Sequence, residues 1–278
     1  MAARDILLQL TSYPVPTPHW AIDAAGSLAD TLEAHLSAGL CQIYLPDVSK
    51  WLANKLTHAD EAIAAENRKS QEWAKELLVT FAARIPEARR GAEILIECCS
   101  LISPHDLAQW ARTRDLTVVP VGDGLDWSYV AEGLVFESGR PVLLLPQPKG
   151  SAHRYRSIAI GWDGSRAAAR ALADALPLLS AADTVELLVV AGDKELPTAA
   201  GRSEAQRHLA THGICAGIRT IEAQRRDAGS ALCEEALALG SDLLVMGAFG
   251  HPRVREFVLG GATQSVLDDV RLPVLLSH

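Results

Sequence analysis

The sequence predicts an α/β protein made of two tandem, doubly wound, open parallel sheets, Rossmann-like and with five strands each. Short apolar runs alternate along the chain with longer segments of helical periodicity, the pattern of parallel strands joined by crossover helices. The two halves also end alike, because Arg140–Leu144 and Leu272–Leu276 share the run Pro-Val-Leu-Leu. A chain of 278 residues suits two domains of about 150 residues.

Ten segments are predicted to be strands because they are short and rich in leucine or β-branched residues, as expected of strands covered on both faces. In the first half they are Ile6–Leu10, Cys41–Leu45, Glu93–Cys98, Thr117–Val121 and Val142–Leu145. In the second half they are Ser157–Gly161, Thr184–Val190, Gly217–Glu222, Leu243–Met246 and Val274–Leu276.

The segments between the strands of the second half have apolar residues three and four positions apart, which predicts helices that lie on a sheet. These helices are Ser165–Leu179, Ser203–Thr211, Ala228–Leu239 and Gly261–Val270. Gly240 is expected to end the third of them as a C-terminal cap.

In the first half, Lys55–Arg84 predicts one long charged amphipathic helix. The side chains expected on its buried face are Ala62, Trp73, Leu77, Leu78 and Phe81.

The predicted domains are residues 1–147 and 154–278. The stretch Pro146–His153 between them has the polar, proline- and glycine-containing composition of a linker.

Composition excludes several classes of protein. The net charge is −8 and the sequence has no dense run of lysine and arginine, which argues against binding to nucleic acid or to a membrane surface. Apolar runs such as Val142–Leu145 are far shorter than the ~20 residues that cross a bilayer. The start of the chain lacks the features of a secretory signal, so we expect a cytoplasmic protein.

The five cysteines are Cys41, Cys98, Cys99, Cys215 and Cys233, an odd number without a C-x-x-C pair. We expect reduced, structural thiols. Adjacent Cys98 and Cys99 should point to opposite faces of their strand.

In open α/β sheets, ligands bind beyond the carboxyl ends of the strands where the strand order reverses, here beside the first and fourth strands. The fourth strand of the second half ends at Met246 and leads into Gly247-Ala248-Phe249-Gly250-His251. A longer stretch then reaches Gly260, and Gly261 opens the last helix. Glycines let a ligand approach the backbone without obstruction by a Cβ atom.

The start of the last helix is a predicted anion site. The N–H groups of Gly261, Ala262 and Thr263 have no partner within the helix, and helix N-termini attract phosphate. Arg253 and Arg255 lie in the preceding loop and could supply positive charge.

This motif resembles that of the universal stress proteins, whose nucleotide-binding members have Gly-x-x-Gly, nine residues, and then Gly-Ser/Thr. Gly247, Gly250 and Gly260 match its glycines. The resemblance covers nearly the whole chain and implies that the second domain binds ATP or a related adenine nucleotide, with or without magnesium. Gly261 departs from the family pattern, because it stands where the family has a serine or threonine hydroxyl.

The resemblance also implies roles for residues outside the glycine loop. Asp163 would face adenine or ribose, and a carboxylate there can accept hydrogen bonds from an amine or sugar hydroxyls. Val190 matches a position that touches adenine, and His251 could donate to phosphate. The expected nucleotide-binding residues are Asp163, Val190, Met246, Gly247, Gly250, His251, Gly260, Gly261, Ala262 and Thr263.

Structural interpretations of the same residues remain open. The glycines could permit a sharp loop, Val190 could be a core residue, and His251 a turn residue. Asp163 precedes Ser165, a good N-cap, and could serve helix capping. His208 and His212 are spaced like zinc ligands, but the accompanying Glu is missing and a solvated helix face is expected instead.

The first half lacks the site. Thr11 and its neighbours replace the Asp of the second half, and Asp123 and Asp126 would put negative charge where a phosphate would lie. Trp127 and Tyr129 would fill the space. We expect a degenerate partner domain without nucleotide.

The function expected is that of a nucleotide-binding stress-response module. The alternatives are a nucleotide-free interaction scaffold and a slow ATP-hydrolysing enzyme, although no nucleophile–base pair or Walker motif is present. The resemblance further suggests pairing of Val142–Leu145 with Val274–Leu276, and a homodimer formed through these terminal strands.

Overall fold

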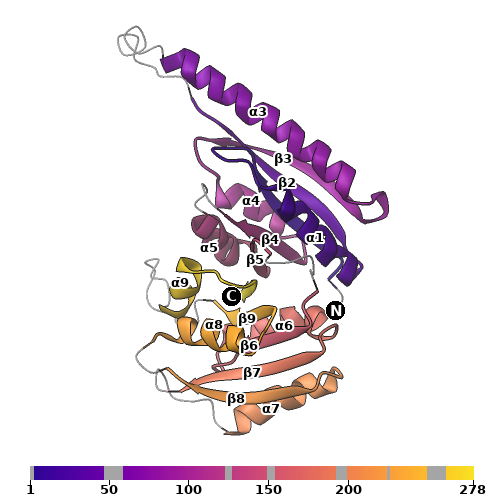
Figure 1. Ribbon diagram of the computed structural model, residues 1–278, viewed down its shortest axis with the longest axis vertical. Coiled ribbons are helices and arrows are strands. Elements are labelled where there is room, and N and C mark those ends of the chain that lie inside the picture. The colour runs from indigo at the N-terminus through magenta and orange to yellow at the C-terminus, as the bar shows by residue number, and fades with distance from the viewer. Residues whose placement is uncertain are drawn as a thin grey trace.

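The computed structural model describes residues 3–46, 59–122, 127–148, 154–191, 199–223, 226–248 and 261–278. These residues form one continuous sheet of ten strands with helices on both faces (Figure 1). The strand order is β3-β2-β1-β4-β5-β10-β9-β6-β7-β8. The predicted α/β fold class is confirmed, and the two predicted sheets are joined edge to edge.

All ten predicted strands are present. Those of the N-terminal half are β1 (Asp5–Thr11), β2 (His35–Tyr44), β3 (Arg90–Cys99), β4 (Leu116–Val121) and β5 (Val142–Pro146). Those of the C-terminal half are β6 (Ser157–Gly161), β7 (Thr184–Ala191), β8 (Ala216–Glu222), β9 (Leu243–Gly247) and β10 (Val274–Ser277). The second strand was predicted too short because Leu36–Leu40 is entirely buried and shows no alternation.

Helices connect the strands in both halves. The N-terminal half has α1 (His19–Leu32), α3 (Ala59–Arg84), the 3-10 turn η1 (Glu87–Arg89), α4 (Pro104–Ala111) and α5 (Trp127–Ser138). The C-terminal half has α6 (Arg166–Leu179), α7 (Ala199–Thr211), α8 (Ala228–Ala238) and α9 (Gly261–Asp268). Gly240 has a positive φ of 68° directly after α8, which confirms it as the predicted cap.

The two halves repeat one topology. Within each half the strands are parallel, and the first strand lies between the second and the fourth. The halves meet where β5 and β10 pair antiparallel, with Leu143 opposite Leu275. The carboxyl ends of the two sets of strands therefore point in opposite directions.

The predicted pairing of the terminal strands is confirmed, but it occurs within the chain. Strand β5 has β4 and β10 as neighbours, and β10 has β5 and β9. Both sides of each strand are occupied, so neither strand has a free edge on which a second chain could pair. The predicted interface of a homodimer, through these terminal strands, is therefore wrong. The strands with one neighbour are β3 and β8 at the two ends of the sheet.

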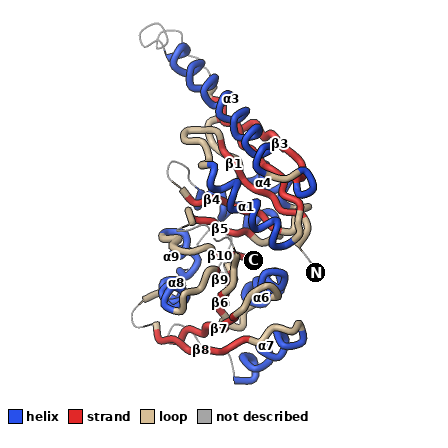
Figure 2. The backbone as a smooth tube through the Cα atoms, turned by 45° about the vertical axis from the view of Figure 1, so that its right-hand side comes forward, coloured by secondary structure: helices blue, strands red, loops and turns tan. Residues whose placement is uncertain are grey.

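The sheet separates two hydrophobic layers that each run through both halves. One layer packs α1, α3, α6 and α7 against the sheet, and Phe81 of α3 is fully buried in it. The other lies under α4, α5, α8 and α9. Figure 2 shows α8 and α9 on one side of the C-terminal strands and α6 on the other.

Helix α3 begins beyond the sheet and then lies along β2 (Figure 1). Leu77 and Phe81 are buried as predicted, and Trp73 and Leu78 are half-buried. Ala62 is exposed, so its prediction is wrong. The reason is geometric, because the first turns of this helix project past the strands that would cover them. Residues 55–58 of the predicted helix lie outside the described residues.

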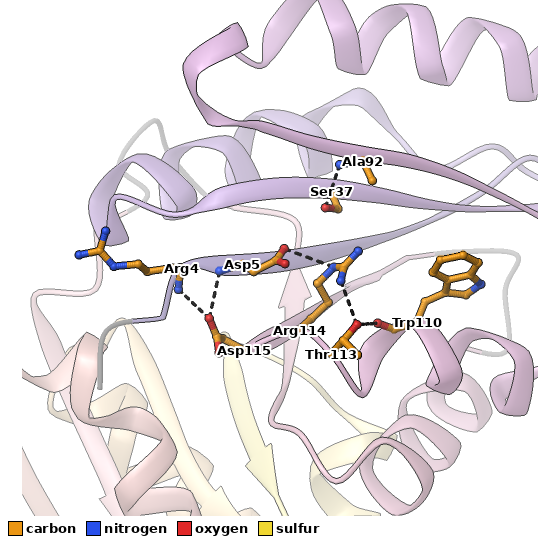
Figure 3. Close-up of polar contacts among 8 residues, drawn as sticks. All are labelled: Arg4, Asp5, Ser37, Ala92, Trp110, Thr113, Arg114 and Asp115. Carbon is orange, nitrogen blue, oxygen red and sulfur yellow. Dashed lines mark hydrogen bonds and ion pairs between the residues drawn. The ribbon is translucent and has the colours of Figure 1, made fainter.

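A carboxylate joins the amino ends of the first and fourth strands in each half. In the N-terminal half, Asp115 Oδ2 accepts from the N–H of Arg4 at 2.8 Å and of Asp5 at 3.1 Å (Figure 3). In the C-terminal half, Asp242 Oδ2 accepts from the N–H of Arg156 at 2.9 Å and of Ser157 at 3.0 Å. The two halves thus share this contact at equivalent positions.

Cys98 is buried and Cys99 exposed, which confirms that they point to opposite faces of β3. The five cysteines are all free. His208 and His212 contact each other edge to face, with ring centroids 4.9 Å apart. In the described residues, no helix has both the length and the apolar character needed to cross a bilayer.

Candidate functional site

The candidate site lies at the carboxyl ends of β6 and β9. These strands are parallel neighbours with Ile160 opposite Val245, and β6 separates β9 from β7. This is the place where the strand order reverses, as the sequence predicts. Asp163 follows β6, and Met246 and Gly247 end β9. The three predicted site residues therefore meet at one edge of the sheet.

The turn after β6 is held by two short polar side chains. Asp163 is exposed, and its Oδ1 accepts from the N–H of Ser165 at 2.9 Å. Ser165 is the N-cap of α6, and its Oγ accepts from the N–H of Ala168 at 3.1 Å. The capping interpretation is thus confirmed for Ser165. Asp163 shapes the preceding turn while its carboxylate stays at the surface.

Gly247 allows close packing between β9 and the first turn of α6. A Cβ atom on Gly247 would lie 2.4 Å from the N atom of Ala168 and 2.5 Å from the carbonyl carbon of Ala167. These are backbone atoms that cannot move aside cheaply. Close packing therefore accounts for a glycine at this position, which also leaves the end of the strand free of a side chain.

Two other predicted site residues belong to the core. Met246 is 3% exposed, and Val190 is half-buried against the hydrophobic layer under α8 and α9. Val190 lies on β7, the strand beside β6, and pairs with Ile221 of β8. Its position near the same edge permits a ligand contact, but packing alone accounts for its side chain.

Helix α9 presents its first turn next to α8. A Cβ atom on Gly229 of α8 would lie 2.0 Å from the carbonyl oxygen of Ala262, so the two helices meet at van der Waals distance. Thr263 is 2% exposed. A Cβ atom on Gly261 would meet no described atom within 4 Å. The first N–H groups of a helix have no carbonyl partner within that helix, which is why anions commonly bind at helix N-termini.

Asp227 stands beside α9 and was missed in the sequence analysis. It is the N-cap of α8, accepting from the N–H of Ser230 at 3.0 Å and from its hydroxyl at 2.6 Å. Burial opposes ionisation, but hydrogen bonds from Ser230, Ser265 and the Gly229 N–H outweigh it and lower the pKa. The Asp before an apolar helical segment was the signal that could have identified this cap.

Comparison with known proteins identifies the C-terminal half. The model of the Universal stress protein family matches residues 154–278. Residues 154–278 belong to the universal stress protein family. No protein with a curated description matches the chain.

Solved structures of universal stress proteins resemble the whole chain in fold. One from Archaeoglobus fulgidus has a TM-score of 0.70 and 15% identity, covering 98% of this chain and 95% of that chain. A putative universal stress protein from Pseudomonas aeruginosa has a TM-score of 0.59 and 15% identity, and the match covers 99% of this chain and 93% of the Pseudomonas chain.

Part of the glycine motif of the universal stress protein domain lies outside the described residues. Gly250, His251 and Gly260 fall there, together with Arg253 and Arg255. The described part of the motif is Gly247 at one end and Gly261 at the other.

The beginning of this glycine loop is tied to the N-terminal half. His278 Nδ1 lies 3.0 Å from the carbonyl oxygen of Ala248. The ring of His278 packs edge to face on Phe136 of α5, with centroids 5.1 Å apart. The site edge of the universal stress protein domain thus has a neighbour in the other half.

The corresponding edge of the N-terminal half has different residues. Strand register pairs Ile6 with Leu116 and Ile158 with Leu243, so Thr11 corresponds to Asp163 and Pro120 to Gly247. Trp127 and Tyr129 begin α5, where Tyr129 is 53% exposed and Trp127 packs on the core. Asp123 and Asp126 lie outside the described residues.

Proposed function

We propose that this protein is a stress-response module whose C-terminal domain binds ATP or a related adenine nucleotide. The observation that carries the proposal is the edge formed by β6, β9 and α9. It combines an exposed carboxylate, a strand end without a side chain and the first turn of a helix that begins at a glycine. These groups match the parts of a nucleotide that need recognition.

The residues have distinct roles in this proposal. The first-turn N–H groups of Gly261, Ala262 and Thr263 would bind phosphate oxygens, because a helix N-terminus carries partial positive charge. Asp163 would accept hydrogen bonds from the ribose hydroxyls or the adenine amine. Gly247 would let the ligand lie close to the backbone. The glycine spacing in the sequence supports the same assignment.

Calorimetric titration of the nucleotide-stripped protein with ATP, with and without magnesium, tests the proposal. We expect saturable heat at one ATP per chain. Asp163→Ala should weaken binding about tenfold or more, because it removes hydrogen bonds to a charged acceptor. The matched control is Asp183→Ala, which removes an exposed carboxylate paired with Arg156 before the amino end of β7. It should leave the affinity unchanged.

Two outcomes favour the alternatives. Absence of heat at millimolar ATP would contradict the proposal and support a nucleotide-free scaffold. Steady release of phosphate by the parent protein, lost in Asp163→Ala, would support an ATP-hydrolysing enzyme. Native mass spectrometry of the protein as isolated reports bound nucleotide and oligomeric state together.

A further inference from the structure

His278 stands where the two halves and the start of the glycine loop come together. It follows β10, which lies between β5 of the N-terminal half and β9 of the C-terminal half. The C-terminus accordingly lies between the two halves (Figure 1). From this place one side chain contacts both of them.

Both backbone polar groups of Ala248 are held by the end of β10. The Ala248 N–H donates to the Ser277 carbonyl oxygen at 2.7 Å, and the Ala248 carbonyl oxygen lies 3.0 Å from His278 Nδ1. A carbonyl oxygen accepts and never donates, so Nδ1 carries the hydrogen of this bond. Ala248 is 0% exposed and follows Gly247, which packs closely on α6. The residue from which the glycine loop departs is thus fixed on two sides.

The ring of His278 is supported by the N-terminal half. It packs edge to face on Phe136, near the end of α5, with ring centroids 5.1 Å apart. Aromatic pairs in this geometry attract each other beyond the area they bury. Phe136 therefore favours one orientation of the ring, the orientation in which Nδ1 reaches the Ala248 carbonyl.

The shared strand plan does not require this contact. The run Pro-Val-Leu-Leu aligns Pro146, at the end of β5, with His278. Strand register then aligns Val121 of β4 with Ala248. A proline side chain has no N–H to donate, so the N-terminal half builds the same strand pairing without this bond. The side-chain donor belongs to the half that has the glycine motif.

We propose that His278 is a positioning residue of the nucleotide site, through which the N-terminal half sets the position of the end of β9. The proposal rests on the proposed function, because it gives the N-terminal half a role at that same site. His278 acts through Ala248 and does not itself touch the ligand. A strand end that is already held loses less freedom when a ligand binds, which favours binding.

Two substitutions separate the donor from the ring. His278→Phe keeps a ring against Phe136 but has no donor, and His278→Asn keeps an N–H near the place of Nδ1 but has no ring. In calorimetric titration of the full chain, His278→Phe should weaken ATP binding about fivefold, and His278→Asn about twofold or less. If the ring merely filled space, this order would be reversed.

Phe136→Ala tests the support from the N-terminal half. It should weaken ATP binding about twofold to threefold in the parent, because the His278 ring loses its preferred orientation. It should have no further effect in His278→Asn, which has no ring to orient. The matched control is Tyr129→Ala, which removes a 53% exposed ring at the other end of α5 and should leave the affinity unchanged.

Amide hydrogen exchange at Ala248, measured without nucleotide, separates this proposal from the proposed function. His278→Phe should raise the exchange rate about fivefold or more, because the bonds between Ala248 and the end of β10 open more readily. His278→Asn should stay within about twofold of the parent. If the parent binds no ATP and exchange still follows this order, the proposed function is wrong while His278 still fixes the strand end.

Three results would overturn the positioning role. They are unchanged Ala248 exchange in His278→Phe, ATP affinity of His278→Phe equal to that of an ATP-binding parent, or weaker ATP binding by His278→Asn than by His278→Phe. Position 278 is exposed, so we expect both variants to fold. If His278→Phe does not fold, the comparison of Phe136→Ala in the parent and in His278→Asn decides the question.

Discussion

The two halves of this molecule have one strand plan but different chemistry at the carboxyl ends of their strands. At the amino ends they agree, since Asp115 and Asp242 make the same pair of backbone hydrogen bonds. At the carboxyl ends, Gln9 and Thr11 stand where the other half has Gly161 and Asp163. The halves therefore share a polar contact at the amino ends of their strands and differ in the residues at the carboxyl ends.

This difference is what the architecture of open α/β sheets leads us to expect. The strands and helices build a scaffold whose stability depends on the buried layers, while the loops beyond the strands are free to change. At the carboxyl ends, the N-terminal half has the uncharged side chains of Gln9 and Thr11 at the positions of Gly161 and of the Asp163 carboxylate.

The largest expected effect concerns the close helix pair in each half. Gly229→Ala would place a Cβ atom 2.0 Å from the Ala262 carbonyl oxygen. In the N-terminal half, Gly133→Ala would place one 2.4 Å from the Pro104 Cβ atom. We expect Gly229→Ala to lower the free energy of unfolding by about 2–4 kcal/mol and Gly133→Ala to lower it by about 1–3 kcal/mol. The first loss is larger because that clash is with a backbone atom.

Urea unfolding measures both losses, and Gly261→Ala is the control because a Cβ atom there meets no described atom within 4 Å. If Gly229→Ala were as stable as Gly261→Ala, the close contact between α8 and α9 would be wrong. The site built on the first turn of α9 would then lose its support.

The shared carboxylates at the amino ends come next. Asp115→Ala should cost about 1–2 kcal/mol, because two backbone N–H groups lose a charged acceptor. Asp242→Ala should cost less, about 1 kcal/mol, since Asp242 is exposed and water replaces part of the interaction. Thermal unfolding measures both, with the exposed Asp30→Ala as control. Negligible losses in both variants would contradict the proposed common role.

Much of the fold could be predicted from the sequence, because strands such as Leu243–Met246 are apolar throughout and end at glycine. The shared Pro-Val-Leu-Leu run identified the two strands that pair at the centre of the sheet. The sequence did not indicate that these two strands pair within one chain, since local patterns do not show which chain supplies a strand's partner. The prediction that Ala62 is buried was wrong for a similar reason, because helical periodicity does not show where the underlying strand ends.

The site was predictable in part. The glycine spacing and Asp163 directed attention to the end of the sheet where the strand order reverses, because they depend on local backbone chemistry. Asp227 could have been found as an N-cap, because it directly precedes an apolar helical segment. Gln9 could not be found from the sequence, because it lies in a strand that otherwise looks like any buried strand.

A smaller effect would sharpen the nucleotide assignment. Gly261→Ser introduces the hydroxyl that the family motif has at this position, where an added Cβ atom would meet no described atom within 4 Å. One added hydrogen bond to phosphate should tighten ATP binding about threefold to tenfold. Calorimetry measures the change, and Gly122→Ser, also at an open position in the N-terminal half, is the matched control. Unchanged affinity in Gly261→Ser would place the phosphates away from α9.

The smallest effect compares two helix caps, charged Asp227 on α8 and uncharged Ser165 on α6. Because the folded-state pKa of Asp227 is lowered from 3.8, its ionised form stabilises the fold above the unfolded pKa. This contribution is lost as the pH falls through the lowered folded pKa. It should be under about 1 kcal/mol, since the carboxylate is only partly buried and solvent screens it.

Asp227→Asn keeps a good cap without the titrating group. Melting temperatures at pH 6 and pH 3 should therefore converge more in this variant than in the parent. Ser165→Ala should lower both by a similar amount, since no charge is involved in that cap. If Asp227→Asn showed the same acid sensitivity as the parent, the hydrogen bonds from Ser230 and Ser265 would not be holding the carboxylate ionised. The contact between the start of α8 and α9 would then be looser than this structure indicates.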